Sequence, residues 1–170
     1  MDHCRCDADV LWCARADAMF NDPGMHVLAV EHQRGRLVVT VDTDATVAGC
    51  PSCGVIAVGH GRRVHEVADA PCFDLSMRVR WRKRVWRCAE TACPTGTFSE
   101  RHDLIARRAK LTARAVGWAT DALEHDDTTV SALARHLGVD WHRCWDAVET
   151  EALRRLADRP GWPGGHVGGG

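Results

Sequence analysis

The sequence predicts an α+β chain in which a small β-rich part is followed by a three-helix part. Apolar residues alternate with a period of two in the first hundred residues, and they recur at helical spacing beyond residue 106. Two pairs of cysteines also bracket the β-rich stretch. We therefore expect a poorly defined N-terminal segment (1–24), a β-rich domain (25–102), a helical domain (106–157) and a disordered glycine-rich tail (158–170).

The first strands are predicted at residues 27–30 and 37–41, where apolar runs flank a polar loop with Gly35 and indicate a β-hairpin. Residues 55–58 and 64–67 are short strand candidates around a turn at 59–61. The first two dozen residues show no sustained period, so no element is expected there.

The strand at residues 75–87 has the strongest pattern. Its odd positions are mostly apolar, and a period of two places the even positions on the opposite face. Those even positions are arginines: Arg78, Arg80, Arg82 and Arg84. Such a row is either a solvated face that discourages edge-to-edge aggregation or a set of phosphate contacts. We favour nucleic acid, because interspersed signs would solubilise a face without mutual repulsion.

Four cysteines form the predicted metal site. They stand in two short clips joined by the β-rich stretch, and tetrahedral Zn²⁺ takes thiolates presented in this way: Cys50, Cys53, Cys88 and Cys93. The alternatives are a redox dithiol and a disulfide. Cys4, Cys6 and Cys13 follow no familiar ligand spacing, and their role stays open.

Three helices are predicted in the second part. The first covers residues 107–124, the second 129–136, and Asp140 is placed to cap a third that ends before Pro160. A short helix, a turn at Gly138 and a longer helix predict a helix-turn-helix, with an ordinary three-helix unit as the alternative. The predicted DNA contacts here are Arg107, Arg108 and Lys110, and, at the start of the third helix, Trp141, His142 and Arg143.

Composition limits the class of protein. The net charge is −1, but residues 60–110 hold twelve Lys and Arg against six Asp and Glu, which is typical of a local anionic partner. Nine cysteines is an odd number in a chain without a signal-peptide pattern, so a disulfide framework is not expected. No apolar run is long enough to cross a membrane. We therefore expect a cytoplasmic protein.

The order of motifs resembles the N-terminal part of bacterial insertion-sequence transposases of the ISL-three group, from about Met19 to Leu156. The resemblance rests on the Cys50-Pro-Ser-Cys-Gly knuckle, the basic strand that enters Cys88, the string from Cys93 to Glu100, and the helix-turn-helix. It implies a structural Zn²⁺ on the four cysteines. It also implies that the ribbon and the helix-turn-helix bind double-stranded DNA at the inverted repeats of the transposon ends.

Family members continue into a DDE-type catalytic domain of ribonuclease-H-like fold, whereas this chain ends in glycines and looks truncated. We therefore expect no enzyme activity and no catalytic residue in this chain. The Gly138-Val139-Asp140 string resembles the tripeptide around the family's first catalytic aspartate, but it lies inside the predicted helix-turn-helix.

The expected function is thus the DNA-binding region of an insertion-sequence transposase. Its expected location is the nucleoid, and its partners are transposon ends and a further copy or full-length transposase. Two alternatives stay open. One is a stand-alone transcriptional regulator or truncated inhibitor of transposition. The other is a zinc-ribbon module whose basic face meets an acidic protein.

Overall fold

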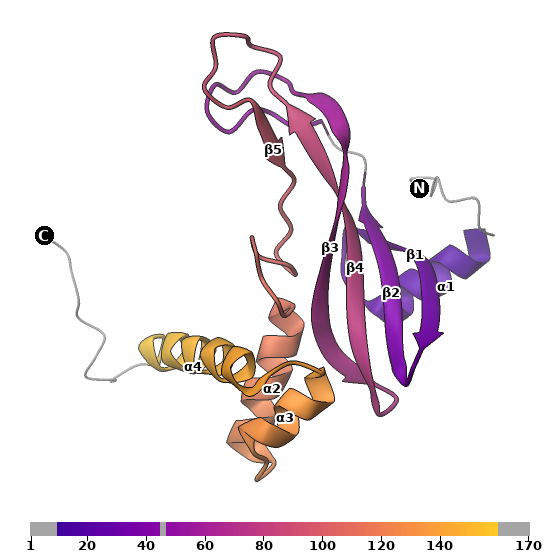
Figure 1. Ribbon diagram of the computed structural model, residues 1–170, viewed down its shortest axis with the longest axis vertical. Coiled ribbons are helices and arrows are strands. Elements are labelled where there is room, and N and C mark those ends of the chain that lie inside the picture. The colour runs from indigo at the N-terminus through magenta and orange to yellow at the C-terminus, as the bar shows by residue number, and fades with distance from the viewer. Residues whose placement is uncertain (1–9, 45–46, 160–170) are drawn as a thin grey trace, which may run out of the picture.

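The computed structural model describes residues 10–44 and 47–159. In this part of the chain a five-stranded mixed sheet is followed by three helices at one of its ends (Figure 1). Four strands run in the order β1-β2-β4-β3, and β5 pairs with the far end of β4. The predicted α+β class is confirmed. The elements are α1 (Val10–Phe20), β1 (Met25–Gln33), β2 (Arg36–Thr43), β3 (Val58–Cys72), β4 (Leu75–Arg87), β5 (Thr97–Ser99), α2 (Ala113–His125), α3 (Val130–Leu137) and α4 (Trp141–Ala157).

Strands β1 and β2 form the predicted hairpin and extend beyond the predicted residues at both ends. Its two-residue turn has Arg34 at φ 46° and Gly35 at φ 77°. Positive φ at both turn residues matches the twist of the flanking strands. The next contact of β2 is not sequential, because β2 pairs in parallel with β4 from Arg36↔Ser76 to Val41↔Trp81.

Strand β3 is one continuous strand of 15 residues, so the predicted turn at 59–61 is wrong. Strand β4 offers register partners along the whole stretch, from Val58↔Arg87 to Cys72↔Leu75. The glycines that indicated a turn occupy an irregularity between Gly59 and Arg62, where Gly61 takes φ 98°. A bulge therefore replaces the turn, and β3 and β4 form a long two-stranded ribbon.

The alternation predicted for β4 is confirmed by burial. Met77, Val79 and Trp81 are buried on one face, and the even positions are more exposed on the other. The buried face packs against the end of α1 and the segment after β5, with Phe20, Leu104 and Ile105 in the same core cluster. Helix α1 forms in a segment where the sequence shows no period.

The helical part differs from prediction at its start. Helix α2 begins at Ala113 rather than at residue 107, because residues 109–112 run beside β3 instead. Leu111 forms a parallel bridge with Ala68, whose N–H donates to Lys110 O at 2.9 Å. Thr112 caps α2 by accepting from Ala115 N at 3.0 Å. The second core cluster lies between this edge and the three helices, and it includes Leu133, Leu137, Cys144 and Val148.

The helix-turn-helix geometry follows from two caps. Helix α3 ends at Gly138, which takes the left-handed conformation at φ 62°. Asp140 then caps α4 by accepting from Arg143 N at 2.9 Å, as predicted. Glycine is needed here, since this conformation places the Cβ of other residues too close to the backbone.

A buried carboxylate joins the helices to the sheet. Asp69 of β3 is 0 % exposed and accepts from Thr112 Oγ1 at 2.5 Å and from Arg114 Nε at 3.1 Å. Arg114 Nη1 also donates to Phe20 O at 2.6 Å, and its guanidinium lies over the Phe20 ring. Strand β3, helix α1 and helix α2 thus meet at one ion pair.

Candidate metal centre and nucleic-acid interface

The four predicted cysteines converge at the end of the sheet remote from the helices, in the two loops at the top of Figure 1. All four Sγ atoms lie within 4.8 Å of one another. Cys50 Sγ is 3.7 Å from Cys93 Sγ, and Cys53 Sγ is 3.5 Å from Cys88 Sγ. Four sulfurs at about 2.3 Å from a tetrahedral ion are about 3.8 Å apart, so the donor set fits a metal of zinc's size and preference.

Local backbone bonds hold each clip in place. In the first, Cys50 N donates to Val55 O and Gly54 N donates to Cys50 O, both at 2.8 Å. Gly54 takes φ 75°, which closes the turn. In the second, Cys88 N donates to Gly96 O at 3.1 Å. Each clip is a tight turn that offers two sulfurs to one point, which is the arrangement of a metal ribbon.

The two clips also contact each other through a pair outside the ligand set. Ser52 Oγ and Thr95 Oγ1 lie 2.5 Å apart. A backbone hydrogen bond at Ser52 is the largest influence on the Cys50 thiol and lowers its pKa to about 6, against burial that raises it. A thiol with a lowered pKa supplies the thiolate that a metal ion requires.

The arginine row of β4 is mostly engaged by the protein itself. Arg84 is 14 % exposed at its side chain and donates to Thr43 O and Asp44 O, both at 2.7 Å. Arg80 pairs with Glu66 at 3.2 Å. Arg78 is half-buried and donates to Gly138 O, and burial is the main cause of its lowered pKa.

Within the described residues, only the guanidinium of Arg82 in that row makes no hydrogen bond or ion pair, and Arg82 is exposed. The expectation of an unbroken free row is therefore corrected. Neighbouring strands and the helix-turn-helix supply carboxylates and carbonyls that a strand pattern does not reveal.

The other predicted contacts are exposed. Arg107, Arg108 and Lys110 lie on the segment between β5 and α2, not on a helix. Trp141, His142 and Arg143 form the first turn of α4, which is the second helix of the helix-turn-helix.

Trp145 was expected in the core but is 39 % exposed. It stacks on Trp141 with ring centroids 5.8 Å apart and planes at 8°. The buried side of α4 is occupied by Cys144 and Val148, which leaves the two indoles on the outer side. The start of α4 therefore presents an aromatic pair beside Arg143.

The sequence analysis missed two further exposed or half-exposed cations, Lys83 and Arg101. Lys83 interrupts the alternation of β4, with its ammonium 5.7 Å from the centre of the Trp81 ring. Both line a pocket with Arg107. Only the register of β4 against β5 and the following segment could have placed them together.

A cysteine ribbon joined through a sheet to a helix-turn-helix defines a metal-ribbon DNA-binding protein. Comparison with family models agrees: residues 46–93 match the zinc-finger of transposase IS204/IS1001/IS1096/IS1165, and residues 100–151 match the helix-turn-helix domain of transposase family ISL3. The chain belongs to the ISL3 family of transposases and carries its DNA-binding region. No curated protein and no solved structure matches it significantly.

Both matched domains are of the DNA-binding kind, and no catalytic domain is evident in residues 10–44 and 47–159. None of the helices described is long and apolar enough to span a bilayer. Cys4, Cys6 and the tail from residue 160 lie outside the described residues, as does the side chain of Cys13.

Proposed function

We propose that this chain recognises the terminal inverted repeats of an insertion sequence at two places, through a zinc-loaded ribbon and through the helix-turn-helix. Cys50, Cys53, Cys88 and Cys93 would hold Zn²⁺. Four thiolates leave no open coordination position, so the ion would act as a cross-link between the two clips and not as a catalyst. Small zinc domains draw much of their folding free energy from the metal.

The observation that carries this proposal is the connection between the two DNA-binding parts. The cysteine clips extend from one end of the β3–β4 ribbon, and the helices pack at its other end (Figure 1). Two contacts fix the helix-turn-helix there, the Asp69 ion pair with Arg114 and the bond from Arg78 to Gly138 O. The two parts are therefore held at one spacing.

That spacing suits a duplex. Strand β4 has 13 residues, and at about 3.3 Å per residue it spans about 40 Å. One turn of B-DNA is about 34 to 36 Å, so both parts can meet the same face of one duplex about one turn apart. We assign groove contacts to Trp141, His142 and Arg143, and phosphate contacts to Arg82, Arg107, Arg108 and Lys110. Arg78, Arg80 and Arg84 position these elements.

Binding and catalysis are divided in this proposal. DDE-type strand transfer needs carboxylates that hold two metal ions, whereas the one cluster of metal-ligand side chains found among the described residues consists of cysteines. We assign strand transfer to a separate catalytic domain of the family. Because an element has two ends, a second copy of the transposase is the expected protein partner, and the chromosome in the cytoplasm is the expected location.

The test is a footprint on an element end with zinc-loaded and zinc-free protein. We expect two protected segments about one turn apart, and one zinc ion per chain by mass spectrometry. Cys53→Ser should lose the metal and the protection beneath the ribbon. Ser52→Ala, in the same clip, is the matched control and should keep both, since it removes no ligand.

Two results would contradict the proposal. One is protection that is unchanged after zinc is stripped and in the Cys53→Ser variant, which would remove the ribbon from recognition. The other is binding that does not distinguish an element end from unrelated duplex at physiological salt.

A further inference from the structure

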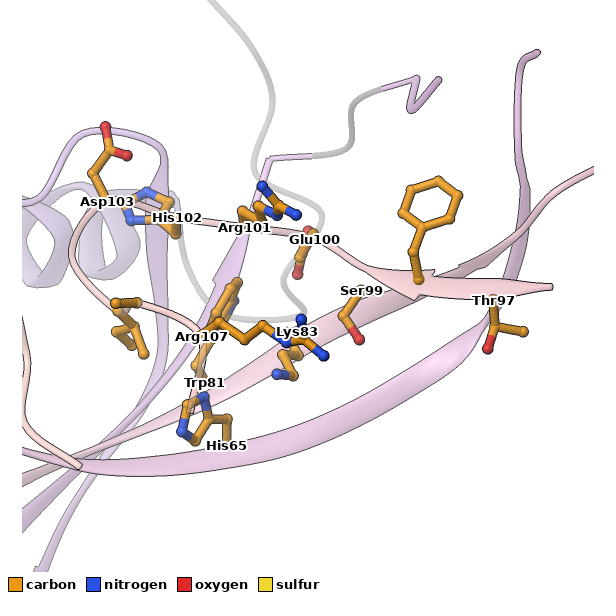
Figure 2. Close-up of a pocket in the computed structure, with 13 residues that line it drawn as sticks. His65, Trp81, Lys83, Thr97, Ser99, Glu100, Arg101, His102, Asp103 and Arg107 are labelled. Atoms are coloured by element: carbon orange, nitrogen blue, oxygen red, sulfur yellow. The ribbon is translucent and has the colours of Figure 1, made fainter. Parts of the chain in front are cut away.

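A pocket of about 690 Å³ lies between β4, β5 and the segment that leads from β5 to α2 (Figure 2). Its lining includes His65, Trp81 and Lys83 from the β3–β4 ribbon. Arg101, His102 and Arg107 come from the segment after β5. The pocket therefore sits where the zinc-finger match, residues 46–93, gives way to the helix-turn-helix match, residues 100–151.

Two buried polar atoms in this lining have no partner among the described residues: Trp81 Nε1 and His65 Nδ1. Trp81 is 2 % exposed, and a buried indole N–H normally donates to an acceptor. An unmet buried donor costs about 1 to 3 kcal/mol. His65 Nε2 donates to Ala109 O at 2.9 Å, which makes Nδ1 an acceptor. The pocket thus offers one free buried donor and one free buried acceptor.

The rim of the pocket is positively charged. Lys83, Arg101 and Arg107 make no ion pair within the described part of the chain. The nearby carboxylate of Glu100 is already used, because it accepts from Arg84 N at 2.5 Å and from Thr43 Oγ1 at 2.8 Å. Asp103 is the other carboxylate of the lining, and it is exposed.

We infer that this pocket binds a phosphate group of the DNA backbone. A phosphodiester offers only acceptor oxygens and one negative charge, which match the Trp81 indole N–H and the Lys83 and Arg107 cations. A water molecule can donate one hydrogen to His65 Nδ1 and the other to a phosphate oxygen. The inference rests on the proposed function, and it adds a contact that fixes the duplex at the junction of the two DNA-binding parts.

The experiment follows indole N–H resonances of the zinc-loaded full chain by ¹H–¹⁵N NMR. Trp81→Phe identifies the Trp81 signal by its loss, and this variant keeps a buried aromatic ring. Inorganic phosphate and duplex DNA are then added separately, with chloride at equal ionic strength as the blank. We expect the Trp81 signal to shift with phosphate and with duplex, and not with chloride.

Affinity provides the second measurement. Trp81→Phe should weaken duplex binding by about tenfold, since hydrogen bonds to charged groups contribute about 1.5 to 3 kcal/mol. Trp118→Phe is the matched control in the helical part, where Trp118 packs edge-on to His136, and its affinity should be unchanged. Lys83→Met keeps the aliphatic stem over Trp81 and removes the charge, so it should weaken binding even if Trp81→Phe fails to fold.

The outcomes separate this inference from the proposed function. A Trp81 signal that ignores phosphate and duplex, while element ends still bind, overturns the pocket and leaves the proposed function standing. A shift with inorganic phosphate but none with duplex also overturns it, because the site then takes free phosphate. A shift with duplex of any sequence, without preference for element ends, supports the pocket and counts against the proposed function.

Discussion

Replacing Asp69 with alanine should lower the free energy of unfolding by about 3 kcal/mol. The Asp69 carboxylate is fully buried, and Thr112, Arg114 and the Ala70 N–H all donate to it. Its removal leaves the Arg114 guanidinium without its counter-charge. Breaking a buried ion pair costs about 3 to 5 kcal/mol. The lower end applies because the Arg114 side chain is 31 % exposed, so water can reach it, and because Arg114 keeps its bond to Phe20 O.

The assay is equilibrium unfolding in guanidinium chloride with zinc present, followed by circular dichroism and checked for an unchanged slope. Glu66→Ala is the control. It breaks the Arg80 ion pair, whose side chains are 32 % and 43 % exposed, and it should cost less than about 1 kcal/mol. Asp69→Ala combined with Arg114→Met should be more stable than the sum of the two single effects, because the uncompensated charge is gone.

The reasoning is refuted if Asp69→Ala costs no more than Glu66→Ala. It is also refuted if the double variant shows simple additivity, since the two groups would then not act as a pair.

Two further predictions concern a glycine and a histidine. Gly138→Ala should destabilise the protein by about 1 to 2 kcal/mol, because φ is 62° there and the new Cβ would lie 3.4 Å from Arg78 Nη2. Gly117→Ala, inside α2, should instead stabilise by about 0.5 to 1 kcal/mol, and thermal melts of both variants measure the contrast. His26 bonds to Asp17 and Asp44, and the Asp17 bond is the main reason that its pKa is raised. A raised pKa means that its stabilisation is complete below pH 6.5 and is lost as pH rises through the folded value. The difference in melting temperature between wild type and His26→Gln should therefore shrink from pH 6 to pH 9, and a difference that is constant with pH would contradict this.

Prediction from the sequence succeeded where the signal is local. The alternation in β4 and the Asp140 and Gly138 caps each depend on a few neighbouring residues, and the structure contains all of them. The cysteine spacing belongs to the same class, since each clip is a short turn. These features required no knowledge of distant contacts.

Prediction failed where a distant partner decides the outcome. Residues 109–112 lie beside β3 because Leu111 meets Ala68, which lies 43 positions earlier in the chain. The 59–61 stretch continues as strand because β4 pairs alongside it. Helix α1 has no clear period, yet it forms where Phe20 and Ala16 can pack on the sheet.

For this protein the sequence by itself determined the kinds of parts: a strand with an arginine face, two metal clips and a helix-turn-helix. Local periodicity, turn residues and caps are encoded within a few positions, so they can be read without a fold. Only the tertiary structure decided which arginines remain free, how the helices are fixed to the sheet, and that Trp81, Lys83 and Arg107 share a pocket. Those outcomes depend on side chains from separate strands and loops, which become neighbours only when the chain is folded.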